Sequence, residues 1–175
     1  MTYLGEREIG FDAVEIGFPS ILGCRAIVVV TAGGLFGYHL NGNLSTLKKN
    51  AFVNFITGHL QGNAPAMLYA ASAGAGLAQD YQELRDIAAD LVYGGPIYWA
   101  SLPAAGSVFV HFQDINHTTC AITSRAWVDA TDNVPGNKGP YVAGLNRTMA
   151  NGAATTSMYT HVSTVGLRAV YPTLR

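Results

Sequence analysis

The sequence predicts a single α/β or α+β domain, in which two or three helices accompany a mixed sheet with antiparallel hairpins. At 175 residues the chain has the length of one domain, and no linker or internal repeat divides it. Several short apolar runs rich in β-branched residues end at glycine- or proline-containing turns, which is typical of strands. Two longer stretches instead carry apolar residues at helical spacing.

The N-terminal part of the chain is expected to form strands. Residues 11–22 predict a short strand or an irregular lead-in that Pro19 interrupts. Residues 25–31 are rich in β-branched side chains and precede the small residues 32–34, which indicates a strand followed by a tight turn. Residues 35–40 then form the second strand of a hairpin.

Two segments predict helices. Residues 45–60 carry apolar side chains at helical spacing, with Asn43 or Ser45 as a candidate N-cap and Gly62 as a candidate end. Residues 81–93 show the same periodicity and form the second helix.

Five further segments are expected to be strands, namely 66–72, 97–102, 107–112, 118–123 and 160–170. A long stretch rich in Gly, Asn and Thr, 129–156, lies before the last of them and predicts a loop. A loop of this length in a compact domain is usually functional or mobile.

The composition excludes several classes of function. Charged residues make up only 12% of the chain and its net charge is -1, so no basic face is available for nucleic acid or for an anionic membrane surface. No apolar run is long enough for a transmembrane helix, and the N-terminus lacks the apolar region of a signal peptide. We therefore expect a cytoplasmic protein, or a secreted effector without a cleavable signal peptide.

The two cysteines, Cys24 and Cys120, are too few for a disulfide framework and lack the spacing of a zinc site. Free thiols in a reducing compartment are the favoured state, and a single bridge between the two is the alternative. No metal and no cofactor is predicted.

Cys24 and His39 are the strongest candidates for chemistry. A thiol attacks as the thiolate, so a nearby imidazole predicts a reactive Cys24 with a pKa below the ordinary value of about 8.5. Gly23 leaves room for a substrate carbonyl, and the main-chain N–H of Cys24 would donate to the developing oxyanion. Tyr38 and Asn41 are assigned to substrate binding beside them, with core packing and a turn as their respective alternatives.

The register of the hairpin decides whether the two side chains can meet. A turn centred on residues 33–34 places His39 opposite Val28, about 13 Å along the strand from Cys24. A turn on residues 32–33 places His39 opposite Ala26 and makes Cys24 its diagonal neighbour, about 7–8 Å away at the backbone. A three-residue loop would put the two side chains on opposite faces. The structural alternative is that both are core residues.

The segment Leu-Gly-Cys at 22–24, followed by a strand, a turn and the pattern Gly-x-x-Gly-x-His ending at His39, resembles the signature of the chemoreceptor glutamine deamidases. The separation of fifteen residues between cysteine and histidine is similar to that of the cytotoxic necrotizing factor deamidase toxins, which share that fold. The resemblance covers roughly residues 18–125, and the tail from Trp127 onward has no counterpart.

This resemblance implies a layered sandwich of mixed, largely antiparallel sheet, with residues 1–175 forming one deamidase-like domain. It also implies that Cys24 is the nucleophile and His39 the general base. In the family a threonine hydroxyl or a main-chain carbonyl upstream of the cysteine orients the histidine. Phe18 occupies the threonine position in this chain, so Ser20 or a carbonyl near Phe18 is the expected substitute.

The leading hypothesis is a bacterial effector or toxin that deamidates a glutamine in a target protein. A thiol hydrolase or transglutaminase using the same pair is the related alternative. A non-enzymatic oligomeric binding or assembly domain is the alternative from another class, favoured by the low charge and the long polar loop. Among the other candidates, Cys120 could form a weaker second Cys–His site with His111 or His117, and His59 and His161 are expected to be structural.

Overall fold

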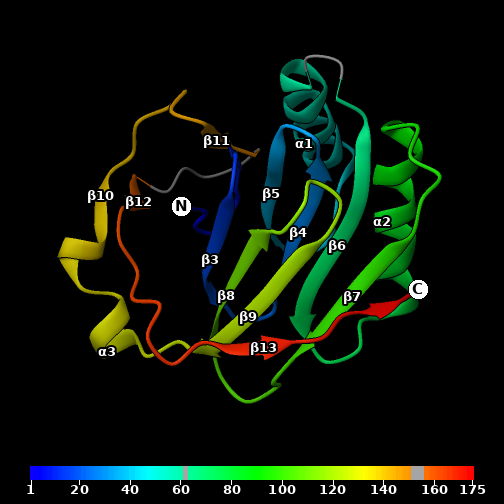
Figure 1. The fold of residues 1–175 in the computed structure, drawn as a ribbon. Coiled ribbons are helices and arrows are strands. Elements are labelled where there is room, and N and C mark those ends of the chain that lie inside the picture. The colour runs from blue at the N-terminus through cyan, green and yellow to red at the C-terminus, as the bar shows by residue number, and fades with distance from the viewer. Residues whose placement is uncertain (61–62, 151–155) are drawn as a thin grey trace.

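The computed structural model describes residues 1–60, 63–150 and 156–175. Two β-sheets stack face to face, and two helices cover the outer face of the larger sheet, so the molecule has an α/β/β layering (Figure 1). This arrangement confirms the expected layered sandwich of mixed sheet with few helices. Gly62, the expected end of the first helix, lies outside the described residues.

The larger sheet has seven strands in the described part of the chain. Only the β6–β7 pair is parallel; the other pairs are antiparallel. In sheet order the strands are β11 (Arg147–Met149), β2 (Glu8–Asp12), β5 (Gly34–Asn41), β4 (Cys24–Thr31), β6 (Pro65–Ala73), β7 (Ile97–Leu102) and β14 (Thr173–Leu174).

The smaller sheet has five strands in the order β1 (Thr2–Tyr3), β3 (Glu15–Ile21), β8 (Val108–Asp114), β9 (Cys120–Ala126) and β13 (Arg168–Val170). The β1–β3 pair is parallel and the others are antiparallel. The chain end thus pairs with both sheets: β13 lies beside β9 of the smaller sheet, and β14 lies beside β7 of the larger one.

Two long helices follow from the expected periodicity. Helix α1 (Thr46–His59) begins after Ser45, whose hydroxyl accepts a hydrogen bond from the Lys48 main-chain N–H. Helix α2 (Ala78–Asp90) begins three residues earlier than predicted, because the Asp80 carboxylate accepts from the Leu77 N–H and caps its first turn. Both helices pack on the larger sheet in one apolar cluster.

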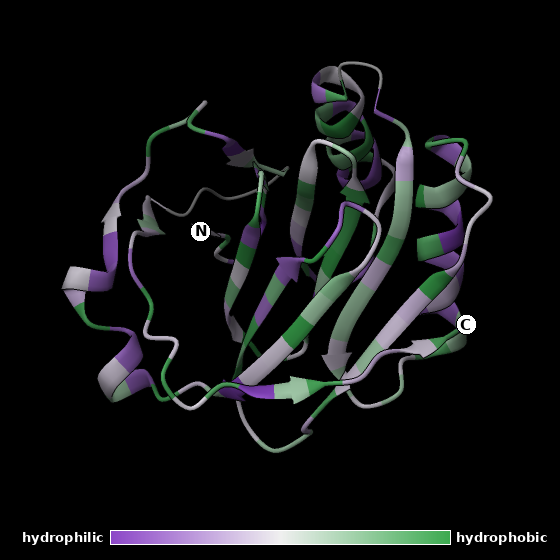
Figure 2. Ribbon diagram, in the orientation of Figure 1, coloured by the Kyte–Doolittle hydropathy of each residue, from purple (hydrophilic) through white to green (hydrophobic). Residues whose placement is uncertain are grey.

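Strand β4 is the centre of the molecule, and all of its residues are buried. Its alternate side chains Cys24, Ala26, Val28 and Val30 face the smaller sheet, while Ile27 and Val29 face the helices. Hydrophobic residues accordingly run along the inner strands (Figure 2). A strand covered on both faces reads in sequence as a continuous apolar run, as this one does.

The hairpin of β4 and β5 adopts the second of the registers considered above. Thr31 pairs with Gly34 and Ala26 pairs with His39, so the turn consists of residues 32–33. Cys24 pairs with Asn41, which makes His39 its diagonal neighbour on the same face of the sheet.

Residues 11–22 form parts of two strands, β2 and β3, and Pro19 marks a bulge in β3. The pairing with β8 shifts between Phe18 and Ile21, and Ser20 has a positive φ of 56°. The bulge accommodates a proline inside a strand because the ladder is already interrupted there.

The C-terminal third differs from the prediction. Only Arg168–Val170 of the expected strand 160–170 pairs with a neighbour, because Val162 packs into an apolar cluster without joining a ladder and Gly166 has a positive φ of 80°. The expected loop 129–156 contains short elements in its described part: α3 (Asp129–Asp132), a 3-10 turn (Pro135–Asn137), β10 (Lys138–Pro140) and β11. Strand β10 pairs with β12 (Ser157–Tyr159).

None of the helices in the described ranges is long and apolar enough to cross a membrane.

Gly37 tests the packing between the sheets. A Cβ at this position would lie 2.7 Å from Leu4 Cδ1 and 2.9 Å from Phe18 Cζ, so Gly37→Ala should lower the free energy of unfolding by about 1–3 kcal/mol. Gly58→Ala is the control, since a Cβ there has no neighbour within 4 Å among the described residues and the position is helical; it should raise stability by up to about 1 kcal/mol. Chemical denaturation measures both free energies of unfolding. An unchanged value in Gly37→Ala would contradict the close packing of the two sheets at this position.

Candidate functional site

His39 is almost completely buried, at 1% exposure, between the two sheets. Its Nδ1 lies 2.9 Å from the main-chain carbonyl oxygen of Leu4, and the ring packs edge-on against Phe18. Because a carbonyl can only accept, Nδ1 carries the proton and donates it to Leu4. Nε2 is therefore an acceptor, and it has no hydrogen-bond partner in the described part of the chain.

Burial determines the charge of this imidazole. Desolvation lowers the pKa of His39 to about 4, against smaller opposing effects of the Leu4 carbonyl and the Glu6 carboxylate. At neutral pH the ring is uncharged, with a free basic nitrogen. A neutral ring can accept a proton at Nε2, although burial makes it a weaker base than an exposed imidazole, whose pKa of about 6.5 is nearer to neutral pH.

Cys24 lies on the same face of the sheet and is 6% exposed. Burial raises its pKa above the ordinary value, and the negative charge of Glu6 raises it further. The Leu22 main chain, Arg7 and Arg25 partly offset these effects. The thiol is therefore protonated at rest, which corrects the expectation of a pKa below about 8.5. No hydrogen bond joins the sulfur to the unpartnered His39 Nε2.

The carboxylate of Glu6 links the two residues electrostatically. It raises the pKa of both Cys24 and His39, so it lies within reach of both. The Asn41 side-chain amide donates a hydrogen bond to it, and Asn41 is also the strand partner of Cys24. Glu6 was not identified from the sequence, because it lies in a turn with no motif around it.

Two cavities open on this region. Cys24 and Gly23 line one of about 430 Å³, at the end of the larger sheet where strand β4 begins and strand β6 ends. His39 and Ser20 line another of about 240 Å³, together with Gly5, Glu6 and Tyr159. The thiol and the imidazole thus line different cavities, although their backbones are diagonal neighbours.

The larger cavity is built around main chain. Gly23, Gly42 and Gly74 all have positive φ, and a Cβ at any of them would meet no atom of the described chain within 4 Å. The space in front of Gly23, where a substrate carbonyl is expected, is open. Because side chains are missing on three sides, main-chain groups are accessible to a polar ligand there.

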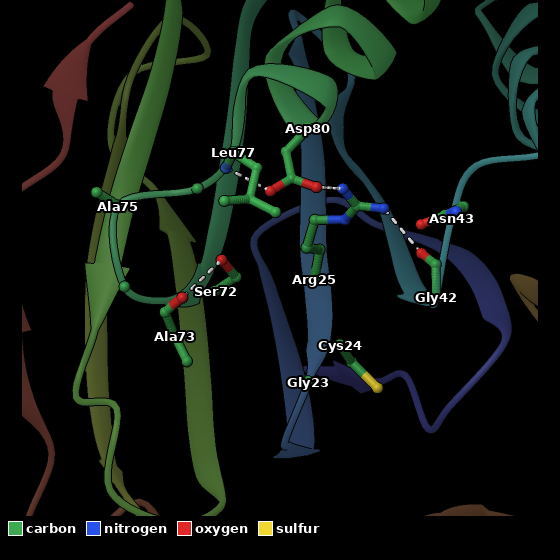
Figure 3. Close-up of a pocket in the computed structure, with 12 residues that line it drawn as sticks. Gly23, Cys24, Arg25, Gly42, Asn43, Ser72, Ala73, Ala75, Leu77 and Asp80 are labelled. Carbon is green, nitrogen blue, oxygen red and sulfur yellow. Dashed lines mark hydrogen bonds and ion pairs between the residues drawn. The ribbon is translucent and has the colours of Figure 1, made fainter.

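Arg25 closes the other side of this cavity. Its guanidinium pairs with Asp80 of helix α2 and donates to the Gly42 carbonyl at 2.8 Å (Figure 3). It also pairs with Glu83 of the same helix, at 2.6 Å. The Cys24 sulfur points away from this guanidinium (Figure 3). The buried ion pairs fasten the start of α2 to the beginning of β4, which holds the cavity wall in place.

Two of the expected site residues have other contacts. Ser20 does not orient His39: its hydroxyl lies 3.0 Å from that of Ser107, and the Leu4 carbonyl holds the ring instead. Tyr38 does not face the site, because residues next to each other in a strand point to opposite faces. Its ring packs on Phe52 among the helices.

The second candidate pair is not assembled. His111 Nε2 lies 3.2 Å from Glu15 and its Nδ1 lies 3.3 Å from Thr123, while Cys120 lies opposite Asp114. Burial raises the pKa of Cys120 to about 12. Both cysteines are free thiols. Within the described ranges, no cluster of three or more His, Cys, Asp or Glu side chains could hold a metal ion.

The remaining histidines lie at the surface. His117 lies 2.6 Å from Asp114 and is 60% exposed at its side chain. His59 Nδ1 lies 2.6 Å from the Phe55 carbonyl in the last turn of α1. His161 is exposed.

No protein-family model matches the chain, and no curated protein matches it. The resemblance to the glutamine deamidases therefore remains a prediction from the motif.

Thiol reactivity tests the electrostatics of Cys24. Peptide-resolved alkylation by iodoacetamide should show a midpoint for Cys24 above about 8.5 and a higher one for Cys120. Glu6→Gln removes a negative charge that opposes ionisation, so the Cys24 midpoint should fall. Glu15→Gln is the matched control and should leave it unchanged. An unshifted midpoint in Glu6→Gln would contradict the assigned cause.

The buried imidazole should make stability depend on pH. The folded protein holds the His39 pKa at about 4 while the unfolded chain has about 6.5, so the unfolded state binds more protons between these values. Stability is then complete above pH 6.5 and falls as the pH decreases to 4, by up to about 3 kcal/mol. As the pH decreases, the denaturation midpoint should fall less steeply in His39→Gln than in wild type. The variant His59→Gln, at an exposed site, should follow wild type. Equal slopes in His39→Gln and wild type would contradict the burial effect.

Proposed function

We propose that the protein is a cysteine-dependent hydrolase of side-chain carboxamides, acting on glutamine in a target protein, with Cys24 as nucleophile and His39 as general base. One observation carries the proposal. A buried neutral imidazole has its Nδ1–H held by a carbonyl and its Nε2 without a partner among the described residues, on the same face of a sheet as a thiol at the diagonal position.

The main-chain carbonyl on Nδ1 supports this role because it fixes the tautomer. With Nδ1 protonated, the nitrogen available for proton transfer is always Nε2. A main-chain carbonyl in this position is also one of the two orienting groups that the deamidase resemblance implies. The group is Leu4, further upstream than the expected position near Phe18.

The raised thiol pKa defines how the first step runs. Cys24 is neutral at rest, so its proton leaves as the carbon–sulfur bond forms rather than beforehand. The sulfur attacks the side-chain carbonyl carbon of glutamine and Nε2 takes the thiol proton, giving a tetrahedral oxyanion. Main-chain N–H groups beside Gly23 are the candidate donors to that oxyanion. A thiolate of high pKa is intrinsically the better nucleophile, but this compensates for only part of its low population, so the reaction depends on proton transfer to Nε2 during the attack.

The remaining steps return both groups to their starting state. The carbon–nitrogen bond breaks as the imidazolium gives its proton to the departing nitrogen, which releases ammonia and leaves a thioester. Water then attacks the thioester carbon while Nε2 accepts its proton. The carbon–sulfur bond breaks, the thiolate recovers the proton, and glutamate is released.

The two cavities support a substrate that approaches from outside the sandwich. The carboxamide would enter the cavity of about 430 Å³ at Gly23, where the main chain is exposed. A side-chain rotation of Cys24 toward His39 would then satisfy Nε2. Action as a secreted bacterial effector or toxin, or in a cytoplasm, rests on the resemblance to the deamidase toxins alone.

Deamidation is tested directly with the full chain. The protein is incubated with a bacterial and a eukaryotic cell extract in heavy-oxygen water, and peptides are searched for glutamine converted to glutamate with one heavy oxygen. Wild type should generate labelled glutamate at defined sites together with ammonia, because the new oxygen comes from water. Cys24→Ser and His39→Gln should each reduce labelling by at least about a hundredfold.

Cys120→Ser is the matched control, a cysteine substitution away from the site that should retain the labelling. Absence of any labelled site above the Cys24→Ser background in both extracts would overturn the proposal in favour of a non-enzymatic domain. Incorporation of an added amine at the same glutamines, in place of water, would indicate the transglutaminase alternative.

A further inference from the structure

Glu8 is a fully buried carboxylic acid that the proposed reaction does not use. It is 0% exposed and begins strand β2. Ile9 pairs with Tyr38, and the Arg7 main-chain N–H donates to the His39 carbonyl at 2.9 Å, so Glu8 lies between two residues that contact the segment around His39. Ile9 and Tyr38 face the helices, and neighbouring strand residues alternate, so Glu8 and His39 both lie on the other side of the sheet.

A single peptide group connects the two side chains. The carbonyl oxygen of Leu4 accepts the hydrogen bond from His39 Nδ1 at 2.9 Å. The N–H of the same peptide group belongs to Gly5, and it donates to Glu8 Oε2 at 2.5 Å. The carboxyl group therefore contacts one end of the peptide and the imidazole contacts the other.

The surrounding turn holds this peptide group in place. The Glu8 main-chain N–H donates to the Gly5 carbonyl at 3.0 Å, which closes a turn over residues 5–8. A Cβ on Gly5 would lie 3.3 Å from Glu8 Oε2 and 3.6 Å from the Tyr159 ring, so glycine allows the close approach. Without its partner on the N–H, the Leu4–Gly5 peptide would be free to rotate its carbonyl away from Nδ1.

The geometry points to Glu8 as a positioning residue for His39. We infer that its carboxyl group fixes the Leu4–Gly5 peptide, and that this peptide presents its carbonyl to Nδ1 and so keeps Nε2 free. The catalytic meaning of this arrangement rests on the proposed function, whereas the arrangement itself does not. It is a carboxyl–histidine pairing in which a main-chain amide stands between the two groups.

Electrostatics support this relay, by which we mean the connection from Glu8 through the Leu4–Gly5 peptide to His39. Hydrogen bonds in series polarise one another, so an acceptor on the Gly5 N–H makes the Leu4 carbonyl a stronger acceptor for Nδ1–H. That effect grows when the imidazole gains a proton during the reaction. Burial raises the pKa of Glu8, while the Gly5 N–H and the nearby Arg147 lower it. Arg147 itself donates to the Tyr3 carbonyl at 2.6 Å.

The test compares two substitutions that differ only in the contact. Glu8→Gln retains an oxygen that can accept from Gly5, whereas Glu8→Met has a similar volume and no such acceptor. Histidine side-chain spectra from nitrogen-15 NMR distinguish the two imidazole tautomers directly. Wild type and Glu8→Gln should show His39 protonated at Nδ1, and Glu8→Met should lower the ratio of the Nδ1–H to the Nε2–H form at least about tenfold.

Glu83→Gln is the matched control, a buried carboxyl on helix α2, which covers the opposite face of the same sheet, and it should leave the His39 tautomer unchanged. In the deamidation assay Glu8→Met should lower kcat by about ten- to a hundredfold with little change in KM, and Glu8→Gln should restore most of it. A folded Glu8→Met with an unaltered tautomer ratio would overturn the inference.

Hydrogen exchange covers the case in which Glu8→Met does not fold. In the wild type the Gly5 amide should exchange as slowly as the amides of β5; exchange at the rate of an exposed turn would overturn the relay. The spectra need no substrate. Loss of the proposed function in the deamidation assay would therefore leave the relay standing, and an unmoved tautomer would refute the relay while activity persists.

Discussion

The two-residue turn between β4 and β5 is the constraint on which the rest of the site depends. It pairs Thr31 with Gly34 and thereby decides which side of the sheet every later residue of β5 faces. A turn longer by one residue would move His39 to the helical side and Tyr38 to the interior. The close approach of the main chain at Asp12 and Ala13, 2.6 Å and 2.7 Å from a hypothetical Cβ, reserves position 34 for glycine.

Burial between two sheets gives this site its particular chemistry. Cys24 and His39 are both uncharged at rest, because desolvation disfavours the thiolate and the imidazolium alike. A thiolate–imidazolium ion pair in the resting protein is therefore disfavoured, because burial destabilises both charged forms. The arrangement instead favours a proton transfer that occurs together with bond formation, at a nitrogen whose position is set by main-chain contacts.

The sequence was informative where a pattern is local. The β-branched run at 25–31 and the periodicity of 45–60 predicted β4 and α1, and small residues at 32–34 predicted the turn. These residues did not decide whether the turn lies at 32–33 or at 33–34, because that choice depends on how β5 packs beside the neighbouring strand β2. The position of Tyr38 was available from strand alternation and was assigned to the wrong face.

The polar contacts of the site could not be predicted in the same way. Leu4 acts through its carbonyl, which every residue has, and Glu8 lies in a strand whose pairing with β5 is visible only in three dimensions. Ser20 was expected to point at His39, but the bulge at Pro19 gives it a positive φ and directs its hydroxyl to Ser107. A single residue added to a strand re-aims the side chains around it.

The pairing of the chain end with both sheets has a consequence for solubility. An open β-sandwich presents unpaired backbone groups at its margins, which invite another chain to dock there. In this fold β13 covers the margin at β9 and β14 covers the margin at β7, with Pro172 between them. One short segment thus covers a margin of both sheets, and its detachment would expose the unpaired backbone of β9 and β7 to pairing with another chain.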